Sequence, residues 1–121
     1  MSPLVVIAIG LVGGIGAIGR FLLDGAVSAR VARSFPWGTL AVNLTGAFAL
    51  GVLAGATLSE NAYRIAGVGL LGAYTTFSTW MLESHRLAED GRLRLGVVNL
   101  LASLVAGVAV AWLGRGIGGA L

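Results

Sequence analysis

The chain has 121 residues, of which 57% are hydrophobic, 20 are glycine and none is cysteine. Only 11% are charged, against about 25% in a soluble domain, which excludes a water-soluble enzyme, a disordered tail and a cysteine-rich or zinc module. The eight basic residues are all arginine and stand singly or in pairs between apolar runs, a layout typical of membrane anchors and not of a nucleic-acid interface. We therefore expect a small all-α integral membrane protein.

Four charge-free runs of 18 to 23 residues predict four transmembrane helices. Helices of these lengths reach roughly 27 to 35 Å, which matches the hydrocarbon core of a bilayer. They form a single domain with short loops, and we place the spans at residues 3–23, 37–58, 65–84 and 95–114. The positive-inside rule puts the first and third loops in the cytoplasm, because six arginines flank that side (Arg20, Arg30, Arg33, Arg86, Arg92, Arg94) and two flank the other (Arg64, Arg115).

Glycines recur along three of the helices, at Gly10, Gly14 and Gly19, at Gly46, Gly51 and Gly55, and at Gly107. Small residues let helices approach closely in lipid, so tight packing inside one bundle is the first interpretation for most of them. The same surface also favours a homo-oligomer. Residues 14–19 and 67–72 match G-x-G-x-x-G, but both lie inside apolar spans and not between a strand and a helix, so we expect no nucleotide site.

Polar residues inside the spans indicate where a solute could pass. Asn43 lies deep in the second helix, where its amide either bonds a neighbouring helix or is offered to a dehydrated anion. Asn99 and Ser103 share one face of the fourth helix and leave the same two alternatives.

In the third helix, Gly72 is followed by hydroxyl residues at positions 75, 76, 78 and 79. Such a string can break the helix and free its carbonyl oxygens, or it can bond to the preceding turn of a continuous helix, and composition does not separate these readings. Phe77 and Trp80 lie beside these hydroxyls and present electropositive ring edges, although ordinary packing explains such a pair as well. The hydrogen-bond donors inside the spans are neutral, and the first, second and fourth spans contain no carboxylate. This combination favours passage of a small anion over that of a cation.

Three segments together resemble the Fluc (CrcB) fluoride channels over essentially the whole chain. Residues 14–21 are similar to the family's G-A-x-x-R segment, and residues 38–46 to G-T-x-x-V-N-x-x-G. Residues 72–83 resemble G-x-x-T-T-F-S-T-F-x-x-E, the most specific of the three. The resemblance implies a passive channel that exports cytoplasmic fluoride across the inner (plasma) membrane and relieves its toxicity.

The resemblance also implies an antiparallel, dual-topology homodimer with two pores, in which the third helix is broken near mid-membrane. The carbonyls of Gly72 and Thr75 would hold a structural sodium ion at the dimer centre. Asn43 would be the amide donor to fluoride and Phe77 the ring that meets it. The other expected pore residues are Ser78, Thr79, Trp80, Asn99, Ser103 and, near a pore end, Glu83, and Arg20 would lie in a vestibule or at the interface.

The chain departs from the family pattern in three respects. Trp80 replaces a phenylalanine, Asn99 stands where tyrosine is frequent, and the uneven arginine count fits dual insertion poorly. Two other functions stay open. A small proton-coupled multidrug exporter needs a carboxylate at membrane depth, and the first helix has none before Asp24. A non-transporting subunit of a membrane complex would explain the glycines but not the hydroxyl string.

Overall fold

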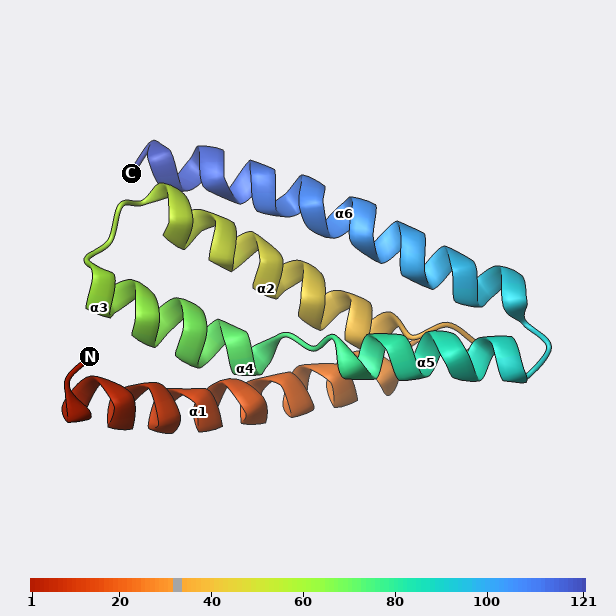
Figure 1. Cartoon of the computed structure of the whole chain (residues 1–121). Coiled ribbons are helices and arrows are strands. Elements are labelled where there is room, and N and C mark those ends of the chain that lie inside the picture. The colour runs from red at the N-terminus through yellow and green to blue at the C-terminus, as the bar shows by residue number, and fades with distance from the viewer. Residues whose placement is uncertain (32–33) are drawn as a thin grey trace.

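The computed structural model describes residues 1–31 and 34–121, and all the regular elements in that part of the chain are helical (Figure 1). They are α1 (Pro3–Ser28), α2 (Trp37–Gly55), α3 (Glu60–Tyr63), the π-helical segment η1 (Arg64–Leu71), α4 (Gly72–Tyr74), α5 (Ser78–Glu89) and α6 (Leu93–Gly119). Arg33, counted above with the first loop, lies outside the described residues.

Within residues 1–31 and 34–121, four helical stretches are long and apolar enough to cross a membrane, as predicted: Pro3–Ser28, Trp37–Gly55, Glu60–Glu89 and Leu93–Gly119. Both termini and the α2–α3 connection lie at one end of the bundle, and the other two connections lie at the opposite end (Figure 1). Helices α1 and α6 continue five residues beyond the expected spans. A charge-free run marks the apolar segment, whereas the helical hydrogen bonds continue into the polar boundary.

Helices α2 and α6 run alongside each other and touch through four glycines, which we call the glycine seam. A Cβ atom added at Gly51 or Gly55 would lie 2.2 Å from a carbonyl oxygen of α6, at Ala111 and Arg115 respectively. The relation is reciprocal, because a Cβ at Gly114 or Gly118 would lie 2.3 Å and 2.1 Å from carbonyl oxygens of α2. Backbone thus meets backbone along this seam, and no larger residue fits.

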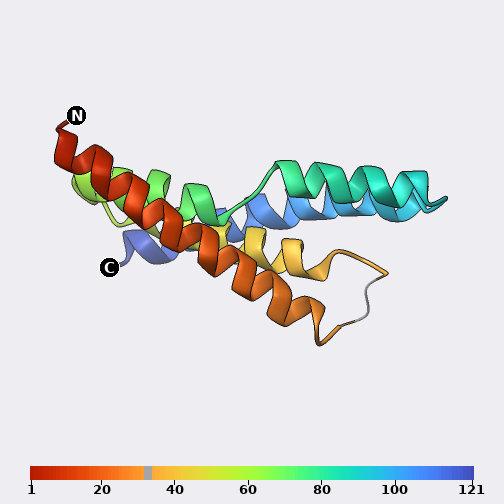
Figure 2. The ribbon, with the colours of Figure 1, turned by 90° about the horizontal axis from the view of Figure 1, so that it is seen from below.

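Helix α1 crosses η1 and α4 (Figure 2) through another close approach, since a Cβ at Gly16 would lie 2.2 Å from the carbonyl oxygen of Leu70. The expected close packing also holds at Gly46, where a Cβ would lie 2.3 Å from Cγ2 of Thr75. For Gly10, Gly14 and Gly107 it is wrong within one chain, because nothing lies within 4 Å of an added Cβ. Repetition of glycine indicates a small-residue face but does not tell what covers it.

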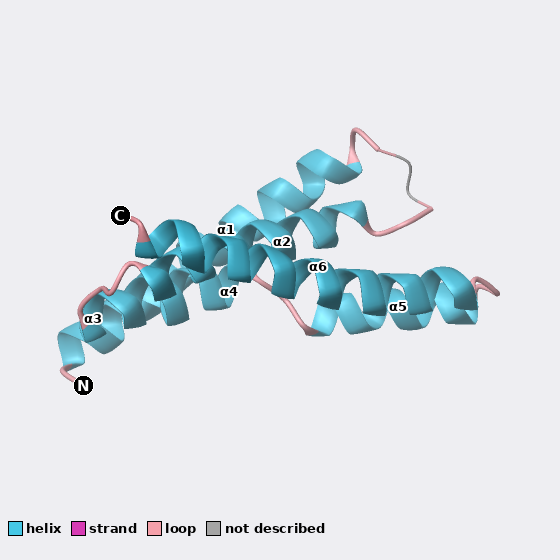
Figure 3. Cartoon of the chain, turned by 90° about the horizontal axis from the view of Figure 1, so that it is seen from above, coloured by secondary structure: helices cyan, strands magenta, loops and turns pink. Residues whose placement is uncertain are grey.

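The third membrane stretch is the irregular one. Its first part passes from α3 through η1 into α4, and a non-helical connection then leads to α5 (Figure 3). Thr75 has φ −79° and ψ 160°, which is extended backbone, so the helix stops at Tyr74 and starts again at Ser78. The connection lies beside the middle of α2 and delivers the residues of the hydroxyl string to one place.

Candidate functional site

The side chain of Asn43 completes the backbone of the α4–α5 connection. Its Oδ1 accepts from the N–H of Thr76 at 2.8 Å, and its Nδ2 donates to the carbonyl oxygen of Thr76 at 2.8 Å. A primary amide has the same donor and acceptor as a peptide group, so Asn43 pairs with Thr76 as a neighbouring strand would. Asn43 thereby provides hydrogen-bond partners for backbone that no longer has helical ones.

The carbonyl oxygens of residues 72–75 lose their helical donors at the interruption, those of Gly72 and Thr75 among them. In a continuous α-helix the N–H of Thr76 would bond to Gly72 and that of Thr79 to Thr75. Here the first N–H goes to Asn43, and the second bonds to Oγ1 of Thr76 at 3.2 Å. The hydroxyl of Thr75 donates to Leu71 at 2.9 Å. The carbonyl oxygens of Gly72 and Thr75 therefore do not make the hydrogen bonds that they would make in a continuous helix.

The first turn of α5 carries the exposed part of the site. Phe77 is 69% exposed, Ser78 is exposed, and Thr79 is half-buried. The N-terminal end of this 12-residue helix carries a positive partial charge, which favours an anion, and the Thr79 N–H in its first turn is already bonded to Thr76. The rings of Phe77 and Trp80 meet edge to face, with centroids 5.7 Å apart and planes at 89°.

The indole N–H of Trp80 is already used within the chain, because it donates to the carbonyl oxygen of Asn99 at 3.1 Å. Asn99 is 1% exposed and donates through Nδ2 to Oγ of Ser84 at 2.8 Å. Ser103 donates to Oδ1 of Asn99 at 3.3 Å. Of these expected pore residues, Asn99 thus lies inside the α5–α6 contact, and Ser103 is half-buried at its edge.

A small polar cavity of about 50 Å³ lies directly behind the connection. Its lining brings together α1, α2, the connection and α5 through Arg20, Asp24, Thr39, Val42, Thr76 and Thr79. Nε of Arg20 is buried without a hydrogen-bond partner among the described residues. The cavity thus combines the guanidinium of Arg20 and three threonine hydroxyls with the carboxylate of Asp24, a polar lining that suits a water or, beside Arg20, a small anion.

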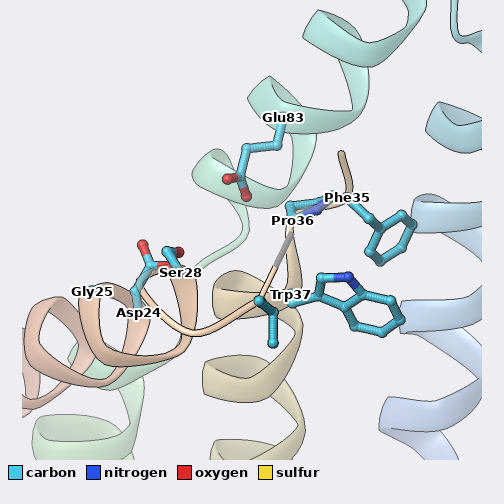
Figure 4. A pocket seen from close by; sticks show the side chains of 8 residues that line it. Asp24, Gly25, Ser28, Phe35, Pro36, Trp37 and Glu83 are labelled. Carbon is cyan, nitrogen blue, oxygen red and sulfur yellow. The ribbon is translucent and has the colours of Figure 1, made fainter. Parts of the chain in front are cut away.

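A wider cavity of about 340 Å³ continues towards the loop end and shares Asp24 with the first. In Figure 4 the carboxyl groups of Asp24 and Glu83 point into the space between α1 and α5, with Trp37 at its far side. Gly38 is required here, because an added Cβ would lie 1.9 Å from Oδ1 of Asp24. Glu83 is the innermost carboxylate of α5, and its Oε1 is buried without a partner among the described residues.

The structure thus gathers Arg20, Asn43, Gly72, Thr75, Phe77, Ser78 and Thr79 around the connection, and puts Glu83 in the adjoining cavity. Sequence reasoning missed Asp24 and Thr39. Asp24 follows Arg20 by one helical turn, and Thr39 belongs to the 38–46 segment described above. The sequence therefore contained a signal for each of the two residues. Among the described residues there is no group of three or more His, Cys, Asp or Glu side chains that could hold a metal ion.

Comparisons with known proteins concern the chain as a whole. Residues 7–115 match the family model described as CrcB-like protein, Camphor Resistance (CrcB). The chain is 53% identical over 109 residues to "Fluoride-specific ion channel FluC 2" of Mycobacterium tuberculosis (strain ATCC 25618 / H37Rv), covering 90% of this chain and 86% of that protein. It is 45% identical over 116 residues to "Fluoride-specific ion channel FluC" of Geobacter metallireducens, covering 92% and 94% respectively.

Proposed function

We infer that this chain, which belongs to the CrcB family, is a fluoride-specific ion channel. Hydrogen fluoride is a weak acid that crosses membranes in its neutral form and ionises in the less acidic cytoplasm, where the anion is trapped. A selective pore lets that anion leave down its electrochemical gradient. We place the protein in the inner (plasma) membrane, where this export relieves fluoride toxicity, and no enzymatic step is needed.

The observation that carries the proposal is the helix interruption held by Asn43. It gathers amide, hydroxyl and helix N-terminal donors at one level of an apolar bundle. Fluoride is small and strongly hydrated, so it can leave water only where several donors replace its shell at once. The second N–H of Asn43, the hydroxyls of Ser78 and Thr79, and the ring edge of Phe77 are the groups we assign to it. Ser103 extends this polar side along α6.

The two cavities supply the approach to that position. Arg20 and the threonines of the small cavity attract the anion, and Glu83 in the wide cavity stands near the pore end. Arg20 shares the small cavity with Asp24 and offsets part of the repulsion that this carboxylate would exert on an anion. We propose that the interruption lies near mid-membrane, so that the anion crosses the other half of the bilayer through a partner subunit's surface.

A second copy of the chain is the partner we propose. Phe77, Ser78 and the hydrogen-bonded pair Thr45–Tyr74 lie at the surface of one subunit, at a level that lipid would otherwise cover. Hydroxyls and open backbone are not stable against lipid tails. Insertion of the two copies in opposite directions brings both interruptions to the same depth and gives two equivalent pores. The open glycines on α1, Gly10 and Gly14, leave room for this contact.

A structural sodium ion at the dimer centre would fit the carbonyl oxygens of Gly72 and Thr75. The oxygens of Gly72 and Thr75 have lost their helical donors, and oxygen ligands suit a hard cation. One pair from each copy would supply four oxygens, and the ion would offset the cost of leaving them unpaired. If the ion is structural, replacing sodium by N-methylglucamine should lower dimer stability. An unchanged melting temperature after this replacement would contradict the sodium site.

Flux from liposomes tests the function and its alternatives together. Purified protein should release trapped fluoride when a potassium-valinomycin potential is applied, and should retain trapped chloride. Equal passage of both ions, or of neither, would exclude a fluoride-specific channel. A small multidrug exporter would instead move a cationic dye when only a proton gradient is imposed. A non-transporting subunit would do neither.

A further inference from the structure

Three residues join the first two turns of α5 to α6 in a closed ring of hydrogen bonds, which we call the α5–α6 ring. The indole Nε1 of Trp80 donates to the carbonyl oxygen of Asn99 at 3.1 Å. Nδ2 of Asn99 donates to Oγ of Ser84 at 2.8 Å, and this hydroxyl donates to the carbonyl oxygen of Trp80 at 2.9 Å. Each residue therefore donates once and accepts once within the ring.

Burial makes the ring rigid. Asn99 is 1% exposed and Ser84 is 5% exposed, so neither can exchange its partner for solvent. A buried donor or acceptor that loses its partner carries its full desolvation cost, and a closed ring leaves no member free to move alone. The indole ring is consequently fixed in both position and tilt.

The fixed indole in turn orients Phe77. The two rings meet edge to face with their centroids 5.7 Å apart, an arrangement that aromatic quadrupoles favour. Phe77 itself is 69% exposed and caps the helix beside the interruption, so its other restraints are few. The edge-to-face contact with Trp80 therefore determines which part of the Phe77 ring faces the proposed anion path.

We propose that Trp80 is a positioning residue, held by Asn99 and Ser84, that sets the ring of Phe77 for fluoride. This rests on the proposed function. It assigns Trp80 and Asn99 away from direct contact with the anion, since the indole N–H is used inside the ring and Asn99 is only 1% exposed. Phenylalanine has no N–H to donate, so the bond to α6 exists only with tryptophan.

The test compares Trp80→Phe, Ser84→Ala and the double variant with Trp112→Phe as the matched control. Trp112 is 74% exposed on α6 and is remote from the ring. We expect Trp80→Phe and Ser84→Ala each to lower the fluoride-to-chloride flux ratio by about two- to tenfold, the range for one buried hydrogen bond. Because both changes open the same ring, the double variant should be no worse than the more damaging single one. Trp112→Phe should keep the native ratio.

The emission of Trp80 provides a readout that does not depend on flux. In a Trp37→Phe, Trp112→Phe background Trp80 is the sole tryptophan, since the chain has three. Ser84→Ala in that background should change the emission maximum and increase the quenching by acrylamide. Unchanged emission would overturn the ring, even if the parent protein conducted no fluoride and the proposed function itself failed.

The flux data can overturn the positioning role separately. If the native protein conducts fluoride and Trp80→Phe keeps the native flux ratio, Trp80 does not position Phe77. A lower melting temperature with an unchanged ratio per folded dimer would reduce the ring to a purely structural role and would contradict the proposal in the same way.

Discussion

The glycine seam between α2 and α6 and the interruption between α4 and α5 satisfy the backbone in opposite ways. Along the seam every helical bond is kept, and four glycines let backbone touch backbone. At the interruption helical bonds are given up, and Asn43 and the hydroxyl of Thr76 replace them. The seam therefore tolerates no added atom, whereas the interruption tolerates no lost polar atom. This difference separates the residues that build the helical frame from those that we propose act on the anion.

The largest effect is expected from a substitution in the glycine seam. Gly114→Ala puts a methyl group 2.3 Å from the carbonyl oxygen of Phe48, where neither helix can yield without separating. We expect it to lower the free energy of unfolding by about 2 kcal/mol or more, the range for overpacked cores. Melting of the purified protein measures this. Gly107→Ala is the control, because its Cβ meets nothing within 4 Å in the chain; equal melting of the two variants would refute the seam.

The second-largest effect is expected for Asn43→Asp, which should reduce fluoride transport. The carboxylate would place an oxygen against the carbonyl of Thr76 where Nδ2 now donates, and would add a negative charge beside the path. We expect fluoride flux to fall by about tenfold or more, since burial of an unpaired charge costs well over 1.4 kcal/mol. Asn61→Asp makes the same change on exposed α3 and should leave flux near native. Native flux in the Asn43 variant would mean that its amide serves neither the backbone nor the anion.

Thr76→Val sharpens the comparison with a smaller change. It keeps the shape of the side chain and removes the oxygen that accepts from the N–H of Thr79 at 3.2 Å. Loss of such a helix cap costs about 1 kcal/mol, so flux and melting temperature should both fall modestly. Thr76→Ser keeps the hydroxyl and should restore most of both. If the serine and valine variants behave alike, the cap is not what holds the interruption.

The smallest effect concerns the approach to the site. Asp24→Asn removes a negative charge from the wall shared by the two cavities, next to Arg20. We expect fluoride flux to rise by about twofold at low ionic strength and the gain to disappear in high salt, because salt screens the charge. Asp90→Asn, on the exposed third loop, is the matched control. A gain that persists at high salt would point to a packing change instead.

The sequence was sufficient to predict the four membrane stretches, because scarcity of charge over 18 to 23 residues is a direct consequence of the bilayer. It did not predict which glycines pack within one chain. Gly114 and Gly118 carry the seam, whereas Gly107 touches nothing. Spacing along a helix indicates a face, but the rotation of that helix against its neighbours depends on all the side chains together.

At the site, the type of residue was predictable and the partner was not. Asn43 stands out in the sequence as a buried amide, yet its pairing with both backbone atoms of Thr76 joins residues 33 positions apart. Trp80 was expected among the pore residues with its ring edge, whereas the bond from its indole N–H to the carbonyl oxygen of Asn99 was not foreseen. Such pairings depend on helix register, which a single sequence does not encode as a local pattern. Positions of the pore groups relative to fluoride stay predictions.

The central claim is that neutral donors at the interruption select fluoride, and its most direct measurement is a reversal potential. The purified protein in a planar bilayer is held with equal chloride on both sides and a tenfold fluoride gradient. A fluoride-specific channel should reverse at the fluoride equilibrium potential, about 59 mV for a monovalent ion. Reversal near zero, where chloride is in balance, would contradict the account.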